Sequence, residues 1–248
     1  MAEIAIIGGT GMTSMQGLSI TRREMVKTPY GSPSGPLIFG DLDGCSVAFL
    51  ARHGHKHSIP PHRINYRANI WALNSVGIKK IIAVGAVGGI ADDCGTGTLV
   101  VAEQVIDYTH ARSGTFFDGK PNEVRHVDFS FPYSESLRRV LIEAAGQTGV
   151  SLIEGGTYGV TQGPRLETAA EIRRMRQDGC TIVGMTSMPE AVLARELDIE
   201  YASCAVVVNR AAGIDGKVID PDELMAAIPS GMEKARKVVA AALAKIAN

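Results

Sequence analysis

The sequence predicts an α/β fold in which a central β-sheet is flanked by helices. The first observation is a series of short, apolar, β-branched runs that are typical of buried strands. These runs are Glu3–Ile7, Ser46–Ala51, Lys80–Val84, Leu99–Ile106, Ile182–Gly184 and Tyr201–Val208. The second is that segments of helical period lie between the runs, namely Tyr66–Val76, Ser136–Thr148, Thr168–Gln177 and Pro189–Leu197. The third is a hydrophobic content of 45% without repeat or linker, which predicts one domain over residues 1–248.

Two segments fall outside this alternation. Arg112–Pro132 is rich in Gly, Phe, Pro and charge and has no clear period. We expect a long irregular excursion there, and such excursions are usually functional or disordered. Towards the end, a helix is expected to start near Asp222. The Ala- and Lys-rich stretch Gly231–Lys245 predicts an amphipathic helix that closes the fold.

The bulk composition favours a cytoplasmic enzyme that acts on a small molecule. A net charge of −1 argues against nucleic acid as a partner. There is no apolar run of roughly eighteen residues that would span a membrane, and Met1–Ile7 lacks the features of an export signal. The four cysteines are widely spaced, which favours free buried thiols over a disulfide framework.

The first predicted strand runs directly into a glycine-rich turn, Gly8-Gly9-Thr10-Gly11. Exposed backbone amides and a Thr hydroxyl suit an anion. A dinucleotide site and a simple tight turn remain open, although Ser14 stands where a dinucleotide fingerprint needs its last glycine. The motif alone does not choose among the three.

The second predicted strand, Ser46–Ala51, is followed directly by Arg52-His53-Gly54-His55-Lys56-His57. An Arg guanidinium matches phosphate oxygens, and a neighbouring imidazole adds another polar group. If the segment stays extended, its three His side chains share one side, which raises a metal site as an alternative. A solvated basic loop is the third possibility. The crowding of positive charge, with no carboxylate nearby, favours an oxyanion site.

Two further strand ends carry similar chemistry. A third glycine-rich turn, Gly85-Ala86-Val87-Gly88-Gly89, is expected after Lys80–Val84, and Thr186 follows Ile182–Gly184. Ligands of α/β sheets collect where strands end. Together these strand ends predict one anion pocket.

At this point the chain resembles a known family, the trimeric purine nucleoside phosphorylases, and most closely their methylthioadenosine phosphorylase branch. The resemblance covers nearly the whole chain and implies a mixed central sheet. The motifs that carry it are Gly8–Gly11, Ala51–Gly54, Asn65–Leu73, Gln162–Arg165 and Gly184–Glu190.

The resemblance implies roles for individual residues. The phosphate ligands would be Thr10, Arg52, His53, Ala86 and Thr186. Gly85 stands where the branch has a Thr, so its contact would come from the backbone. Met185 would lie against the ribose. His126, within the irregular excursion, would reach a neighbouring subunit's site, which implies a homotrimer with composite sites; a surface His in a loop is the alternative.

The base pocket departs from the branch. The strand Tyr201–Val208 runs into Asn209-Arg210-Ala211, where the branch has Asp-x-Asp. Hypoxanthine presents two acceptors, O6 and N7, and an amide can donate to them. Glu167 replaces a Ser of the branch, and its carboxylate can accept from the purine N1–H; a helix-start carboxylate is the alternative. Leu166 replaces an aromatic that stacks on the base. Asn209 and Glu167 together predict a 6-oxopurine.

The group at the sugar 5′ position is predicted from two features. No His follows His126, whereas ordinary 6-oxopurine phosphorylases place one near a 5′-hydroxyl. Pro221, Leu224 and Met225 match the apolar wall that packs a methylthio group in the branch, or they simply cap and pack a helix. We therefore expect phosphorolysis of S-methyl-5′-thioinosine in purine salvage.

No metal or redox cofactor is implied, since phosphate is itself the nucleophilic co-substrate. Alternatives within the enzyme class are an inosine and guanosine phosphorylase and a methylthioadenosine phosphorylase. Outside it, a nucleoside-binding regulatory protein and a dinucleotide-dependent oxidoreductase remain open.

Overall fold

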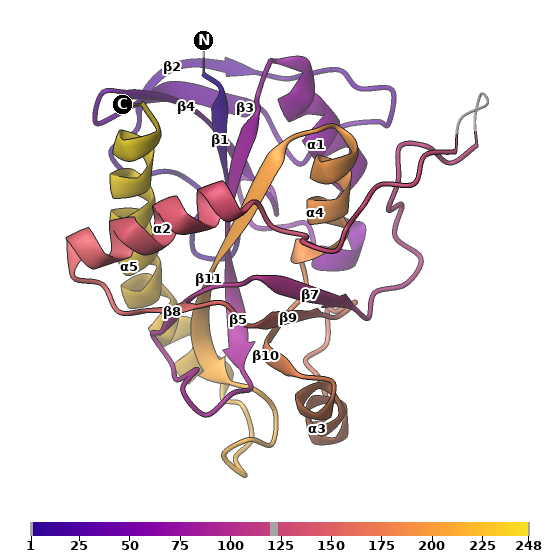
Figure 1. Cartoon of the computed structure of the whole chain (residues 1–248), viewed down its shortest axis with the longest axis vertical. Helices are drawn as coiled ribbons and strands as arrows, with labels where there is room; N and C mark the ends of the chain where they lie inside the picture. Colours follow the sequence, from indigo (N-terminus) through magenta and orange to yellow (C-terminus); the bar gives the residue numbers. More distant parts are fainter. Residues whose placement is uncertain (1, 120–123, 248) are drawn as a thin grey trace.

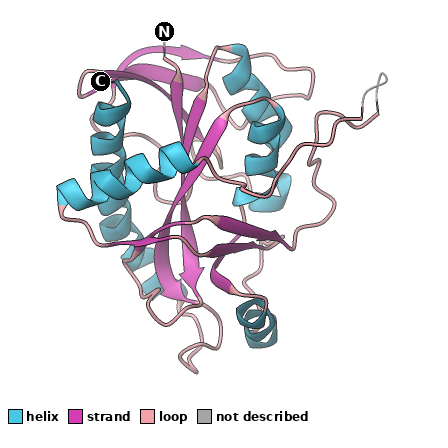
Figure 2. Cartoon of the chain, viewed as in Figure 1, coloured by secondary structure: helices cyan, strands magenta, loops and turns pink. Residues whose placement is uncertain are grey.

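The protein, described by a computed structural model over residues 2–119 and 124–247, has a mixed β-sheet with helices on both sides (Figures 1 and 2). The predicted fold class is thereby confirmed. The sheet runs in the order β2-β3-β4-β1-β5-β10-β9-β7, with β11, β6 and β8 branching from β5. The strands are β1 Ile4–Gly8, β2 Ser19–Glu24, β3 Leu37–Leu42, β4 Cys45–Ala51, β5 Lys80–Gly89, β6 Leu99–Val101, β7 Gln104–Asp107, β8 Leu152–Glu154, β9 Thr157–Val160, β10 Cys180–Gly184 and β11 Glu200–Arg210.

Strand β5 is the centre of the sheet. It pairs in parallel with β1 and β11 and antiparallel with β10. Its residues Ile81 and Ile82 are fully buried on opposite faces, each within a different apolar cluster. Successive strand side chains point to opposite faces, so a strand covered on both sides needs an unbroken apolar run. This is the pattern from which the strand was predicted.

The two faces are covered by different helices. Figure 1 shows α2 (Glu135–Thr148) and α5 (Pro221–Ala247) on one side, and α1 (Tyr66–Ser75) and α4 (Ser187–Glu196) on the other. The fifth helix, α3 (Ala169–Gln177), lies at one end of the molecule. It begins with a capping box between Thr168 and Glu171, which satisfies backbone N–H groups that its first turn cannot.

A turn was predicted for the glycine run after Val84, and this prediction is wrong. The run continues strand β5 to Gly89. A side chain at Gly89 would lie 1.8 Å from the carbonyl oxygen of Cys94. Glycine is needed there because another backbone crosses the strand at close range. The low β-propensity of glycine therefore led to the wrong prediction, because tertiary packing stabilises this part of the strand.

The predicted strand Leu99–Ile106 is two strands, β6 and β7, separated at Ala102 and Glu103. The two pieces have different partners, since β6 pairs with β11 and β8 whereas β7 pairs with β9. Four strands were not predicted: β2, β3, β8 and β9. The side chains of β2 are largely exposed, so no apolar run marks it.

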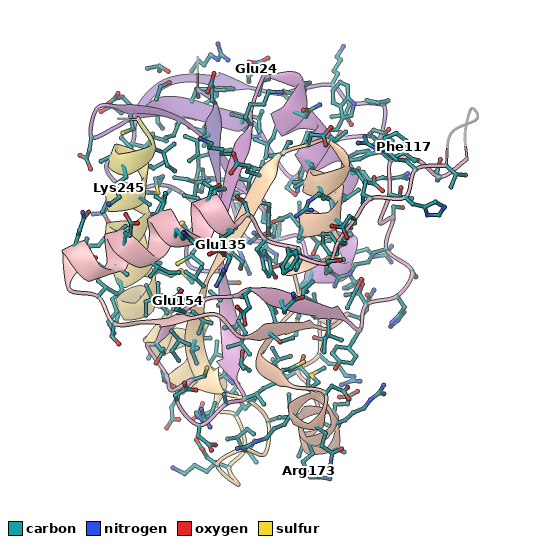
Figure 3. The ribbon with its side chains drawn as sticks, in the orientation of Figure 1. Glu24, Phe117, Glu135, Glu154, Arg173 and Lys245 are labelled. Atoms are coloured by element: carbon teal, nitrogen blue, oxygen red, sulfur yellow. The ribbon has the colours of Figure 1, made fainter. Side chains whose placement is uncertain are left out.

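The C-terminal helix α5 begins at Pro221, not at Gly231, and includes Pro229. It joins the helix expected near Asp222 to the predicted tail helix. The segment Arg112–Pro132 is irregular where it is described, and its residues 120–123 lie outside the described residues. Figure 3 shows Phe117 on this segment, at the edge of the molecule. None of the described helices is long and apolar enough to cross a membrane.

Candidate active site

The ends of three parallel strands bring together residues that were predicted to bind phosphate. Strands β4 and β5 flank β1 in parallel, so the three carboxyl ends meet at one edge. Thr10 lies in the turn after β1, and Arg52 and His53 directly follow β4. The backbone N–H of Arg52 donates to the carbonyl of Gly8 at 2.9 Å, which joins the two loops.

The glycine-rich turn is required by the close approach of Arg52. A Cβ at Gly9 would lie 2.8 Å from the Arg52 guanidinium and 2.8 Å from the carbonyl oxygen of Val84. A larger residue at this position would therefore displace the guanidinium from the strand end. The turn thus has a specific packing function.

Thr186 reaches the same place from the opposite direction. Strand β10 runs antiparallel to β5, with Ile182 opposite Gly89 and Val183 opposite Gly88. Continuing this register places Thr186 beside Gly85, and a Cβ at Gly85 would lie 3.8 Å from the Thr186 hydroxyl. The antiparallel pairing therefore adds a hydroxyl to the cluster at the strand ends.

One cavity brings most of the predicted site residues together. Those that line it are Thr10, Arg52, His53, Gly85, Ala86, Leu166, Glu167, Met185, Thr186, Asn209, Ala211 and Leu224. The sequence assigned no individual role to other lining residues, including Pro61, Val87, Gly88, Val183, Gly184, Val208 and Ile219. Several of these are apolar strand residues, whose patterns predict a core and do not distinguish a cavity wall.

Three predicted residues lie outside this cavity. Pro221 begins α5 and is exposed, and Met225 is 61% exposed. Of the predicted apolar wall, only Leu224 lines the cavity, and Ile219 stands beside it among the lining residues. His126 is exposed on the surface of the chain. Its contribution to a neighbouring subunit stays a prediction.

Arg52 is held by a buried carboxylate. Its Nε donates to Glu190 Oε2 at 2.6 Å and its Nη2 to Oε1 at 2.7 Å. Nη1 donates to the carbonyl of Val84 at 3.0 Å, and the hydroxyl of Tyr201 donates to Glu190 at 2.8 Å. Arg52 and Glu190 are both almost fully buried. Since a guanidinium has five N–H groups, two remain to bind a ligand in the cavity.

His53 is a neutral imidazole with a defined tautomer. Burial and the adjacent Arg52 charge lower its pKa to about 4. Its Nδ1 lies 2.8 Å from the carbonyl oxygen of Ile59. A carbonyl only accepts, so Nδ1 carries the hydrogen and Nε2 of the neutral ring is an acceptor.

The His-rich segment does not have the geometry on which the metal alternative rested. It forms turns and is not extended, and the ring of His57 packs against that of His53 with centroids 4.4 Å apart. No group of three or more His, Cys, Asp and Glu side chains that could hold a metal ion occurs among the residues described.

Asn209 is directed by a bulge in β11. The pairing of β11 with β5 shifts register between Val207 and Asn209, so that Val208 is the extra residue. Bulges re-aim the side chains that follow them, and both Val208 and Asn209 line the cavity. The Asn209 amide donates one hydrogen to the carbonyl of Arg210 at 2.7 Å, which leaves a second N–H.

Glu167 is not part of the capping of α3. Thr168 and Glu171 form that capping box, and Glu167 directly precedes it, near the start of the helix. Its Oε1 accepts a hydrogen bond from the Thr161 hydroxyl at 2.6 Å. This bond orients the carboxylate, and no side chain or backbone N–H of the described residues donates to its second oxygen.

A family model described as the Phosphorylase superfamily matches residues 3–244. The chain belongs to this superfamily. It is a nucleoside phosphorylase of the purine type, in agreement with the predicted enzyme class, as its relatives also indicate.

Two relatives show how this phosphorylase compares with others in sequence. It is 53% identical to the "Probable S-methyl-5′-thioinosine phosphorylase" of Pseudomonas syringae pv. tomato, over 98% of this chain and 99% of that protein. It is 47% identical to the 6-oxopurine nucleoside phosphorylase of Pyrococcus furiosus, over 98% of this chain and 92% of the other.

Solved structures agree with the fold. A methylthioadenosine phosphorylase from an antarctic soil metagenomic library matches with a TM-score of 0.93 and 37% identity, over 99% of this chain and 86% of that one. The methylthioadenosine phosphorylase of Schistosoma mansoni in complex with adenine matches with a TM-score of 0.93 and 30% identity, over 100% and 92% of the two chains.

The sequence analysis missed two charged residues: Glu190, which holds Arg52, and Arg112, which donates to the carbonyl of the lining residue Met185. Glu190 stands within the quoted motif Gly184–Glu190, but nothing in the sequence pairs it with Arg52, which lies 138 positions earlier. Arg112 opens the irregular excursion and has no motif around it. Both act through contacts that only the fold creates.

Proposed function

We propose that this phosphorylase cleaves S-methyl-5′-thioinosine with phosphate, giving hypoxanthine and 5-methylthioribose 1-phosphate in purine salvage. The observation that carries the proposal is that Asn209 and Glu167 line the same cavity as Arg52, His53 and Thr186. The name of the Pseudomonas relative supports the same substrate.

The base-side groups match a 6-oxopurine. The free N–H of Asn209 can donate to O6 or N7 of hypoxanthine, and the free carboxylate oxygen of Glu167 can accept from N1–H. Adenine has no hydrogen on N1 and offers a donor at its 6-position. Adenine keeps the N7 acceptor but has neither O6 nor an N1–H, so the Glu167 carboxylate would face an N1 lone pair with no hydrogen to accept, which is the basis of rejection.

The phosphate-side groups fit monohydrogen phosphate. The two remaining N–H groups of Arg52 and the hydroxyls of Thr10 and Thr186 donate to phosphate oxygens. His53 Nε2, an acceptor, receives the hydrogen of the P–OH group. Glu190 offsets much of the Arg52 charge, so the bound anion is held mainly by oriented hydrogen bonds and can leave with the product sugar.

Phosphate held in this way would attack C1′ from the face opposite the base. Negative charge then develops on the departing purine, and the Asn209 N–H stabilises it. Met185 lines the same cavity and would lie against the ribose. Leu224 and Ile219 present apolar surface to a 5′-methylthio group.

Phosphate is proposed as co-substrate, with no metal or redox cofactor. A cytoplasmic location is supported by the four cysteines, all of which are free and buried. A homotrimer with composite sites is proposed on the family resemblance, with His126 exposed and available to a neighbouring subunit.

The decisive experiment measures phosphate-dependent release of base from S-methyl-5′-thioinosine, S-methyl-5′-thioadenosine, inosine and guanosine. We expect the first to have the highest kcat/KM. Absence of release from all four would refute the enzyme proposal, and preference for the adenine nucleoside would refute the roles of Asn209 and Glu167.

A second candidate substrate class is inosine and guanosine. It is favoured by the 47% identity to a 6-oxopurine nucleoside phosphorylase and by the position of Pro221 and Met225 outside the cavity. The same assay separates the two candidates through the ratio of kcat/KM for methylthioinosine and inosine.

A further inference from the structure

Arg112 has an unusual set of hydrogen-bond partners. Its guanidinium donates to four backbone carbonyls, two on Thr161–Gln162, which precede the cavity-lining Leu166 and Glu167, and two on Met185–Met188, which begin with the lining residues Met185 and Thr186. Nη1 donates to Met185 at 2.8 Å and Met188 at 2.6 Å, and Nη2 donates to Thr161 at 3.2 Å and Gln162 at 2.8 Å. Nε donates to the side chain of Gln162 at 3.1 Å. No carboxylate pairs with Arg112 among the ion pairs of the described residues.

The first of these segments, Thr161–Gln162, contacts the proposed base-binding residue Glu167. Thr161 follows β9, and its hydroxyl donates to Glu167 at 2.6 Å. The carbonyl of Thr161 that Arg112 binds belongs to the same residue that orients the Glu167 carboxylate. Arg112 thus acts on the base-side acceptor through one intervening residue.

The second segment leads to the ribose and phosphate. It follows β10 and includes Met185 and Thr186, both of which line the cavity. Arg112 Nη1 also lies 3.2 Å from the hydroxyl of Tyr66, which donates to the carbonyl of Pro61, another lining residue. A single guanidinium therefore contacts the lining residue Met185 directly, and Glu167 and Pro61 through one intervening residue each.

We propose that Arg112 is a positioning residue, which sets the separation between the base-side segment Thr161–Gln162 and the ribose-side segment Met185–Met188. Strands β9 and β10 are paired up to Val160 and Gly184, and one further bond joins the Thr161 N–H to the Gly184 carbonyl at 2.8 Å; Gln162 and Met185 lie beyond this pairing. The planar guanidinium carries donors in several fixed directions, so it can hold both segments at once. A Lys ammonium is a single point of charge and cannot reproduce that bridge. The proposal rests on the proposed function, because the groups it positions are those assigned to the nucleoside.

The test compares Arg112→Lys and Arg112→Ala with the wild-type chain. Misplacement of a substrate by about 1 Å can cost about 10²-fold in rate, so we expect kcat/KM for methylthioinosine to fall by about that factor in both variants. The KM for phosphate should change less than the KM for nucleoside, since within the described residues Arg112 forms no hydrogen bond with Thr10, Arg52 or His53. Ethylguanidinium added to Arg112→Ala should restore part of the activity.

Arg138→Ala is the matched control. Arg138 is 6% exposed on α2, donates to the carbonyl of Ala102 at 3.0 Å and pairs with Glu135, which Figure 3 labels. It lies outside the cavity, so this variant should lose thermal stability without a change in either KM. Arg112→Lys kinetics equal to wild type, or a loss explained fully by the unfolded fraction, would overturn the proposal. The affinity for hypoxanthine, measured by calorimetry, compares the Arg112 variants with the wild type even if the wild-type chain releases no base. Failure of the proposed function can therefore be distinguished from failure of this proposal.

Discussion

The side-chain amide of Asn209 donates a 2.7 Å hydrogen bond to the backbone carbonyl of Arg210. This bond fixes which end of the amide faces the carbonyl and directs the remaining N–H towards the cavity that Asn209 lines. An ionised carboxylate at this position would face the same carbonyl with an oxygen and would have no hydrogen to donate.

We therefore expect Asn209→Asp to lower kcat/KM for methylthioinosine by about 10²–10³-fold, the range found when one oxyanion donor is removed. A protonated carboxyl suits the donor and acceptor edge of adenine, so activity on methylthioadenosine should rise. Steady-state kinetics on both nucleosides measure the change. Asn74→Asp makes the same chemical change on α1, outside the cavity, and should alter the activity on neither nucleoside. Retained activity on methylthioinosine would contradict the role of Asn209.

Gly85 leaves space that a Thr could fill. A Cβ there would lie 3.8 Å from the Thr186 hydroxyl and 4.0 Å from Arg52 Nη1, which are ordinary contact distances. Gly85→Thr adds a hydroxyl beside the phosphate groups, and one net hydrogen bond is worth about 0.5–1.5 kcal/mol. We expect the KM for phosphate to fall by about two- to tenfold. Gly85→Val has the same shape without the hydroxyl, so an equal effect of Val and Thr would show that the hydroxyl is not responsible.

The sequence was sufficient for the general fold and for the strand ends of the site. Buried strands such as β1 and β11 have continuous apolar runs, and Arg52 and Asn209 stand at or beside strand ends, so their neighbourhood follows from the strand pattern. Exposed β2 and the glycine-rich end of β5 lack such a run. Their pairing depends on partners far away in the chain.

Finer features of the site could not be predicted from the sequence. Whether Met225 or Ile219 faces the cavity depends on how the start of α5 sits against the sheet, and Leu224 alone of the predicted wall lines it. Glu167 was singled out through the family resemblance, because one carboxylate near a helix start is ambiguous. Arg112 contacts carbonyls, which every residue has, so no sequence pattern indicates its partners.

His53 should make stability depend on pH. Its folded-state pKa of about 4 lies below the ordinary value of 6.5, so the unfolded chain binds the proton more readily between these values. The contribution of neutral His53 to the free energy of unfolding is about 3 kcal/mol. It is complete above pH 6.5 and is lost as pH falls towards 4. Burial also lowers the pKa of His57, so total stability is not a clean measure.

The difference between wild type and His53→Gln isolates the effect. Urea unfolding from pH 7 to pH 4 should show a shallower pH dependence in that variant, while His55→Gln, an exposed neighbour, should keep the wild-type slope. Equal slopes in wild type and His53→Gln would show that His53 is not held neutral in the folded chain.

Leu224 should control the preference for the 5′ group. It is the residue of the predicted apolar wall that lines the cavity. One methylene or similar apolar group in a pocket is worth about 1–3 kcal/mol in discrimination. Leu224→Ser should therefore lower the ratio of kcat/KM for methylthioinosine to that for inosine by about tenfold or more, because the hydroxyl favours the polar sugar. Ala226→Ser, exposed on the same helix, adds an equal hydroxyl outside the cavity and should leave the ratio unchanged. An unchanged ratio in Leu224→Ser would place the 5′ group elsewhere and favour inosine and guanosine as the substrate class.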